Sequence, residues 1–225
     1  MYSLLVADDH PLFRDALQTV ISGGLAGSQL LEAESLADAI TLIEAHTELD
    51  LLLLDLSLPD AEGLEGLTKL RETFPWLPVA IVSAHQERQL VLDAITLGAV
   101  GYIPKSTPRE RLLAALTQIL EGQLYLPPDV MRRPAPRASS SPSVTTTSST
   151  SERLARLTDK QLEVLACMTT GMSNKHIARE LLIAETTVKT HVSAILRKLN
   201  ATSRVHAIVI AGEEDLSFYR ANRAH

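Results

Sequence analysis

The sequence predicts an α/β fold, a doubly wound parallel sheet of five strands, followed by a small all-α domain. Short apolar segments alternate with amphipathic segments through the first half of the chain, which is typical of a parallel sheet with helices on both faces. Residues 51–54 are four consecutive leucines, as expected for a strand that is buried on both sides. A segment rich in Pro, Ser and Thr, residues 127–151, separates this half from one in which the spacing is helical throughout.

The elements of the first half follow in order from their apolar patterns and from the residues at their ends. The strands are expected at residues 3–8, 30–34, 51–54, 79–83 and 100–103. The helices are expected at residues 11–21, 35–44, 63–73, 87–97 and 108 to about 120. Four features mark helix ends: Gly23 with Gly24 after the first helix, Ser35 before the second, Pro75 after the third and Pro108 in the first turn of the last.

The second half is predicted to contain four helices. The third of them, residues 185–199, has a continuous apolar face. The residues that cap or end these helices are Thr158 with Gln161, Gly171, Ser173, Asn200 and Ser203. A chain of 225 residues is long enough for two domains, and we expect one at residues 1–126, a flexible linker at 127–151 and the second domain at 152–225.

The net charge of −6 conceals opposite charges in the two halves. Residues 1–130 carry 7 basic and 19 acidic side chains, whereas residues 131–225 carry 14 basic and 8 acidic ones. A small basic domain points weakly to nucleic acid as a partner. The opposite charges also predict that the first domain covers part of the second when the protein is at rest.

The composition excludes several classes of protein. Cys167 is the only cysteine, which rules out an internal disulfide and a thiolate metal site. No apolar run reaches the ~20 residues that span a bilayer, and the N-terminal residues lack the features of a signal peptide. We therefore expect a cytoplasmic protein that has no membrane partner.

Polar residues follow four of the predicted strands. Asp8 and Asp9 follow the first, Asp55 the third, Ser83 ends the fourth, and Lys105 follows the fifth. In a flavodoxin-like strand order these ends meet at one edge of the sheet, where ligands bind. Clustered carboxylates favour Mg²⁺, and the lysine and the serine suit the oxygens of a phosphoryl group. Each residue alone could equally be a helix cap, a strand-end hydroxyl or a solvated charge.

At this point the chain resembles a known family. The receiver domain of bacterial two-component response regulators has a similar pattern, carried here by Asp8–Asp9, Asp55 with Pro59 and Gly63, Ser83–Ala84, and Gly101–Tyr102 with Lys105. The second half, from LTDKQLEVL to HVSAILRKL, resembles the LuxR-type helix-turn-helix domain. The combination resembles the NarL/FixJ subfamily and covers nearly all of the chain except the linker.

The resemblance implies a role for each residue of the acidic site. Asp55 would accept a phosphoryl group from a partner histidine kinase, with magnesium as the cofactor. Asp9, Asp55 and the backbone carbonyl of Ser57 would hold the magnesium ion, and Asp8 would complete the metal site from nearby or through water. Lys105 would pair with the phosphoryl group, Ser83 would turn to hydrogen-bond it, and Tyr102 would follow inward.

Residues 173–199 fit a helix-turn-helix whose second helix lies in the major groove of DNA. Its outward-facing residues are expected to be Thr187, Lys189, Thr190, Ser193 and Arg197. Lys189 and Thr190 are predicted to reach base edges, and Ser193 is a further candidate although the subfamily often has a longer basic residue there. Phosphate contacts are predicted for Thr187, His191, Arg197 and Lys198. A homodimer is expected through the last helix, by Ile208 and Val209 or Ile210.

Two other functions compete with a phosphorylation-gated transcription regulator that is not itself an enzyme. A hydrolase of the haloacid-dehalogenase type also has a carboxylate nucleophile beside magnesium, but it needs a second Asp two residues later, where this chain has Ser57. A LuxR-type regulator that senses a small ligand is disfavoured by an aromatic content of 4% and by the clustered polar strand ends. The transcription regulator is therefore the leading interpretation.

Overall fold

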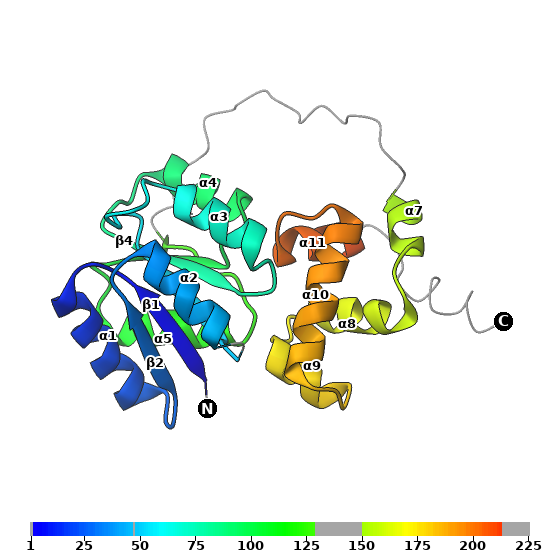
Figure 1. Cartoon of the computed structure of the whole chain (residues 1–225), viewed down its shortest axis with the longest axis horizontal. Helices are drawn as coiled ribbons and strands as arrows, with labels where there is room; N and C mark the ends of the chain where they lie inside the picture. The colour runs from blue at the N-terminus through cyan, green and yellow to red at the C-terminus, as the bar shows by residue number, and fades with distance from the viewer. Residues whose placement is uncertain (1, 47, 129–149, 213–225) are drawn as a thin grey trace.

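A computed structural model describes residues 2–46, 48–128 and 150–212, and it contains an α/β domain and a helical domain (Figure 1). The α/β domain consists of β1 (Ser3–Ala7), α1 (Pro11–Gly24), β2 (Gln29–Ala33), α2 (Leu36–Ala45), β3 (Leu51–Leu54), α3 (Glu65–Thr73), β4 (Val79–Ser83), α4 (Arg88–Thr96), β5 (Gly101–Pro104) and α5 (Arg109–Leu120). The helical domain consists of α7 (Thr150–Ala155), α8 (Asp159–Thr169), α9 (Asn174–Glu180), α10 (Glu185–Leu199) and α11 (Arg204–Gly212).

The five strands form one parallel sheet in the order β2-β1-β3-β4-β5. This confirms the predicted doubly wound fold. Because all strands run in the same direction, the carboxyl ends of β1, β3, β4 and β5 lie next to one another at a single edge. The order therefore brings together the polar residues that follow these strands.

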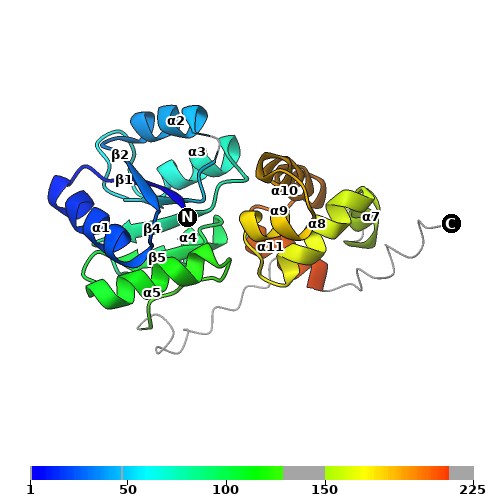
Figure 2. The same ribbon diagram turned by 90° about the horizontal axis from the view of Figure 1, so that it is seen from below.

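The alternation of side chains along β3 divides the core of this domain into two layers. Leu51 and Leu53 pack in the layer that α1 and α5 cover, whereas Leu52 and Leu54 pack in the layer beneath α2, α3 and α4. All four are at most 1% exposed, and each contributes about 1.5–3 kcal/mol by burial. Figure 2 shows α2 and α3 on one side of the sheet and α5 on the other. The leucine run thus anchors the strand that ends at Asp55.

Two glycines that were expected to end the first helix lie inside its last turn, because α1 runs to Gly24. Their role is close packing of α1 against α5. A Cβ atom on Gly24 would lie 2.3 Å from a methyl carbon of Leu113, and one on Gly23 would lie 2.8 Å from a guanidinium nitrogen of Arg109. The helix thus ends at the second glycine of the predicted pair, three residues later than residue 21, and the absence of side chains also serves the contact with α5.

The helical domain has its own core, which α7 helps to form. The capping box of Thr158 and Gln161 begins α8 as predicted, and Asn200 ends α10 with φ 54°. The sequence analysis did not predict α7, whose first residues fall within the predicted linker. Leu154 of α7 is fully buried in the core, so tertiary packing stabilises a helix that is too short to be stable alone.

The helical domain contacts the α/β domain at the amino ends of the strands, opposite the edge described above. Leu49 precedes β3, and Trp76 precedes β4; both contact the helical domain. Figures 1 and 2 both show the two domains side by side.

Among the described residues, no helix combines the length and apolarity that crossing a membrane requires.

Candidate functional site

An acidic cluster lies at the carboxyl edge of the sheet, where the sequence predicted it. Asp8 and Asp55 directly follow β1 and β3, and their side chains are 1% exposed, whereas that of Asp9 is 37% exposed. One ligand atom from each of Asp8, Asp9, His10 and Asp55 lies within 4.8 Å of the others. Carboxylate groups so close repel one another unless a cation lies among them.

Lys105 supplies one positive charge to this cluster. Its Nζ lies 2.7 Å from Asp8 Oδ2 and 2.8 Å from Asp55 Oδ2, and 5.0 Å from the centre of the Phe13 ring. Burial alone would lower the pKa of Lys105, but the hydrogen bonds and charges of Asp55 and Asp8 outweigh it and raise the pKa. The lysine is therefore held as an ammonium ion beside Asp55.

The donor set of the cluster fits magnesium. Three carboxylates and one ammonium leave an excess of negative charge, and hard oxygen ligands are those that Mg²⁺ prefers. Ser57, whose carbonyl was expected to be a further ligand, is exposed in the loop two residues after Asp55. Among the described residues, Asp55 Oδ1 is buried and has no hydrogen-bond partner, which leaves this oxygen available for a new bond.

His10 is a member of the cluster that the sequence analysis did not single out. Its Nδ1 lies 2.6 Å from Asp9 Oδ1 and 3.2 Å from Asp8 Oδ1. Its backbone N–H also donates to Asp8 Oδ1, at 2.9 Å. The signal in the sequence was its place directly after Asp8–Asp9, at the start of α1.

The side chains of Ser83 and Tyr102 both form hydrogen bonds with the backbone of His85. The Ser83 Oγ accepts a hydrogen bond from the backbone N–H of His85 at 3.2 Å, and the Tyr102 hydroxyl donates to the His85 carbonyl at 2.8 Å. Tyr102 is fully buried, and this burial raises the pKa of its hydroxyl. Its side chain thus points inward in this structure, and it ties β5 to the loop that precedes α4.

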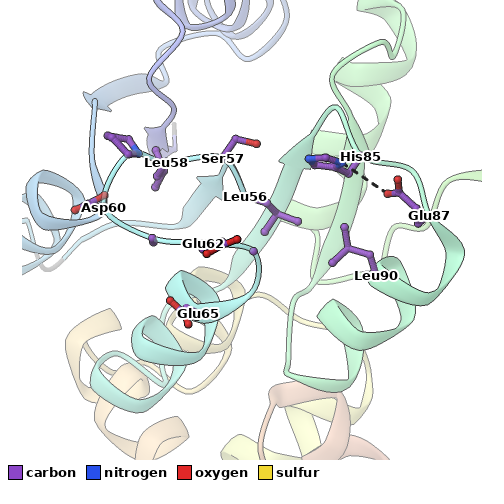
Figure 3. A pocket seen from close by; sticks show the side chains of 12 residues that line it. Leu56, Ser57, Leu58, Asp60, Glu62, Glu65, His85, Glu87 and Leu90 are labelled. Carbon is purple, nitrogen blue, oxygen red and sulfur yellow. Dashed lines mark ion pairs between the residues drawn. The ribbon is translucent and has the colours of Figure 1, made fainter.

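A pocket of about 840 Å³ lies beside the cluster, between the loop after β3 and the loop after β4 (Figure 3). Figure 3 shows Ser57 and Asp60 on one side, and His85, Glu87 and Leu90 on the other. The aspartates of the cluster do not line this pocket. Its acidic side chains add negative charge near the site.

The predicted DNA-binding residues all lie on α10, but the α/β domain covers one of them. Thr187, Thr190 and Arg197 are exposed, and His191, Ser193 and Lys198 are partly exposed. Lys189, which was predicted to face outward and to reach base edges, is 5% exposed. Lys189 points away from the core of its own domain, as predicted, and the α/β domain packs against it. This contact is an instance of the covering of the second domain that was expected at rest.

The contacts of Lys189 define the junction between the domains. Its Nζ donates to the carbonyl of Leu49 at 3.1 Å and lies 4.7 Å from the centre of the Trp76 ring. Glu185, one turn earlier, lies 3.3 Å from the same ammonium group. Asn174 of α9 donates to the Trp76 carbonyl at 3.5 Å. Lys189 cannot reach a DNA base while these contacts persist.

Two other predicted contact groups have neighbours within the helical domain. Lys198 Nζ donates to the Arg156 carbonyl at 2.9 Å and to Gln161 Oε1 at 2.8 Å, so it stabilises the domain in this state. Of the residues expected at a dimer contact, Val209 is 56% exposed, whereas Ile210 is 6% exposed and belongs to the core. Val209 is therefore the better candidate of the two.

Comparison with known proteins settles the family. Residues 4–117 match the response regulator receiver domain, and residues 155–211 match the luxR family of bacterial regulatory proteins. The chain is a response regulator of the LuxR/NarL type. The regulator is 52% identical over 219 residues to the glycerol metabolism activator of Pseudomonas putida. The matched region covers 97% of this chain and 99% of that protein.

Further relatives agree with this assignment. The regulator is 35% identical over 213 residues to the nitrate/nitrite response regulator NarL of Escherichia coli K12, covering 94% of this chain and 95% of that one. A crystal structure of a LuxR family DNA-binding response regulator from Silicibacter pomeroyi has a TM-score of 0.52 at 34% identity, over 57% of this chain and 99% of that chain. The regulator is thus a phosphorylation-controlled DNA-binding protein and not an enzyme, as the sequence predicted.

Proposed function

We propose that a partner histidine kinase transfers a phosphoryl group to Asp55, and that this transfer frees α10 to bind DNA. The observation that carries the first part is the buried Asp55 Oδ1 without a hydrogen-bond partner, beside an ammonium group on the other oxygen. Oδ1 forms the new O–P bond while the P–N bond of the phosphohistidine breaks. The electron pair of that bond stays with the imidazole nitrogen, which takes up a proton.

The residues around Asp55 stabilise the phosphoryl group once Asp55 has accepted it. We assign Asp8, Asp9, Asp55 and the carbonyl of Ser57 to hold Mg²⁺, which when bound neutralises the carboxylates and draws charge from the phosphoryl oxygens. Lys105 stabilises the negative charge that the group brings to the edge of the sheet. Ser83, on the adjacent strand, would donate a hydrogen bond from its hydroxyl group to a phosphoryl oxygen.

The second part of the proposal is that receiver and DNA compete for α10. Lys189 has an N–H···O contact of 3.1 Å to Leu49 and lies over Trp76, so its base contact and its receiver contact exclude each other. Thr190, next to it, is the second residue that we assign to base edges, with Ser193 as a further candidate. Phosphate contacts would come from Thr187, His191 and Arg197, and from Lys198 once its internal bonds open.

Phosphorylation in vitro tests the first part. The purified regulator, incubated with Mg²⁺ and acetyl phosphate, should gain one phosphoryl group, and Asp55→Asn should gain none. Intact-mass spectrometry measures the adduct, and Asp60→Asn, a change five residues away, is the matched control that should still be labelled. An unlabelled wild-type protein, or labelling that survives Asp55→Asn, would refute the assignment.

The regulator is also proposed to act on DNA in the cytoplasm as a homodimer. The support for a dimer is the exposed Val209 on α11, which offers an apolar contact between two copies. Sedimentation velocity of the phosphorylated protein with DNA tests this contact. Val209→Asp should keep the protein monomeric, and a dimer that persists in this variant would contradict the proposed contact.

The identity of 52% to the glycerol metabolism activator favours a role in the use of glycerol as a carbon source. We propose that this regulator activates genes for that purpose. A deletion strain should grow more slowly on glycerol than on succinate, and the wild-type gene should restore growth whereas Asp55→Asn should not. Equal growth of the deletion and parent strains on glycerol would exclude this role and leave the phosphorylation site unaffected.

A further inference from the structure

A buried arginine joins three segments beneath the acidic cluster. Arg14, in the first turn of α1, is 7% exposed. Its Nη1 donates to the backbone carbonyl of Asp8 at 2.7 Å, its Nε to Glu32 Oε2 at 2.8 Å, and its Nη2 to Glu34 Oε1 at 2.7 Å. A buried charge is costly unless it is paired. Here two carboxylates pair with the guanidinium group, and its remaining hydrogen bond goes to a backbone carbonyl.

The carbonyl that Arg14 binds belongs to the peptide between the two aspartates of the cluster. The Asp8 N–H donates to the Ala33 carbonyl at 3.1 Å, so β2 fixes the amide before this peptide. The peptide group is planar, so anchoring its carbonyl oxygen also sets the direction in which Asp9 leaves it. The Asp9 side chain lies against His10, with Asp9 Oδ1 2.6 Å from His10 Nδ1. The orientation of Asp9 therefore depends strongly on this peptide.

We propose that Arg14 is a positioning residue of the magnesium site, holding the Asp8–Asp9 peptide so that both carboxylates face the cation. This inference rests on the magnesium site proposed above. Glu32 and Glu34 in turn hold the guanidinium plane. Lysine cannot replace the arginine, because an ammonium group does not present donors to three acceptors in one fixed plane.

The test measures magnesium affinity separately from stability. Isothermal titration calorimetry with MgCl₂ on the full chain compares the wild type with Arg14→Lys, Arg14→Met and Glu34→Gln. Loss of a group that orients a metal ligand typically weakens metal binding about 10–100-fold, which we expect for both Arg14 variants. Glu34→Gln keeps the arginine but weakens its anchor, so it should cause a smaller loss.

A matched control is available on α3. Arg71 is a partly buried arginine that also donates to backbone carbonyls, those of Leu77 and Pro75, both at 2.8 Å. Arg71→Lys should lower the midpoint of thermal unfolding in EDTA, as Arg14→Lys does, but leave the magnesium affinity unchanged. If Arg14 positions the metal ligands, both variants lower the thermal midpoint, but only Arg14→Lys lowers the magnesium affinity.

Three outcomes overturn the inference. Wild-type magnesium affinity in Arg14→Lys would show that the clamp does not set the ligand geometry. An equal loss of affinity in Arg71→Lys would show that general loosening of the fold is the cause. A wild-type chain that does not bind magnesium at all would remove the proposed metal site and this inference together, whereas the first two outcomes leave the metal site standing.

Discussion

Trp76 offers a way to weaken the contact between the domains without changing the DNA-binding helix. The Lys189 ammonium lies 4.7 Å from the centre of the Trp76 ring, and Lys189 is 5% exposed. We predict that Trp76→Leu raises the DNA affinity of the unphosphorylated regulator. Leucine keeps an apolar side chain at the junction, but it has no aromatic face for the ammonium group.

The magnitude follows from the burial of Lys189. A cation–π contact contributes about 0.5–1 kcal/mol at exposed sites and about 2 kcal/mol when desolvated. A loss of about 1–2 kcal/mol increases the population of the open state by roughly 5–30-fold. Because the apparent Kd is the intrinsic Kd divided by the competent fraction, it should fall by the same factor while the closed state predominates. The hydrogen bond from Lys189 to Leu49 is retained, so the junction is weakened and not abolished.

Fluorescence anisotropy at one fixed salt concentration measures this effect, since DNA affinity depends steeply on salt. The probe is a labelled genomic fragment that the phosphorylated wild-type regulator has selected. The phosphorylated forms of wild type and Trp76→Leu serve as the control, and they should bind equally. An unchanged Kd of unphosphorylated Trp76→Leu, or an equal gain in both phosphorylation states, would refute the competition between receiver and DNA.

Two further predictions concern stability. Asp60 accepts hydrogen bonds from the N–H groups of Leu36 and Ala37 at the start of α2, both at 2.8 Å, so Asp60→Ala should lower the free energy of unfolding by about 1 kcal/mol in urea titrations. Burial would raise the pKa of Asp60, but these hydrogen bonds lower it below 3.8. The stabilisation by the bonds should therefore be complete above pH 3.8 and disappear as the pH falls through the lowered pKa. An equal cost of the substitution at neutral and strongly acidic pH would contradict this pH dependence. Leu182 has φ 53° and is 91% exposed, so Leu182→Asn should raise the free energy of unfolding by about 0.5–1 kcal/mol, unless the left-handed backbone costs leucine nothing.

The fold and the acidic cluster could be predicted from the sequence because both depend on local pattern and one topological rule. Four leucines identify a buried strand, and the parallel order then places Asp55 beside Asp8 and Lys105. No knowledge of detailed packing is needed for that step. The contacts of Lys105 with both aspartates, at 2.7 and 2.8 Å, agree with the predicted convergence.

Packing between distant segments accounts for what the sequence did not reveal. Lys189 contacts Leu49, which is 140 residues earlier, and the spacing of apolar residues along α10 gives no sign of that neighbour. Arg14 looks like an ordinary charge at the start of a helix, and its burial depends on Glu32 and Glu34 across the sheet edge. In each case, the surroundings are set by tertiary structure, which a pattern within one element does not contain.

The phosphorylation site and the domain junction lie at opposite edges of the sheet, so communication between them requires an element that reaches both. Helix α4 does so. It begins just after His85, whose carbonyl accepts the Tyr102 hydroxyl at the site edge. It ends just before Gly98, where a Cβ atom would lie 2.7 Å from the Cβ of Ser203 in the helical domain. A side chain at position 98 would collide with Ser203, so the glycine allows the two domains to approach closely at this point. The Tyr102–His85 hydrogen bond before α4 and the approach of Gly98 to Ser203 after it therefore form a path of direct contacts from the phosphorylation site to the junction.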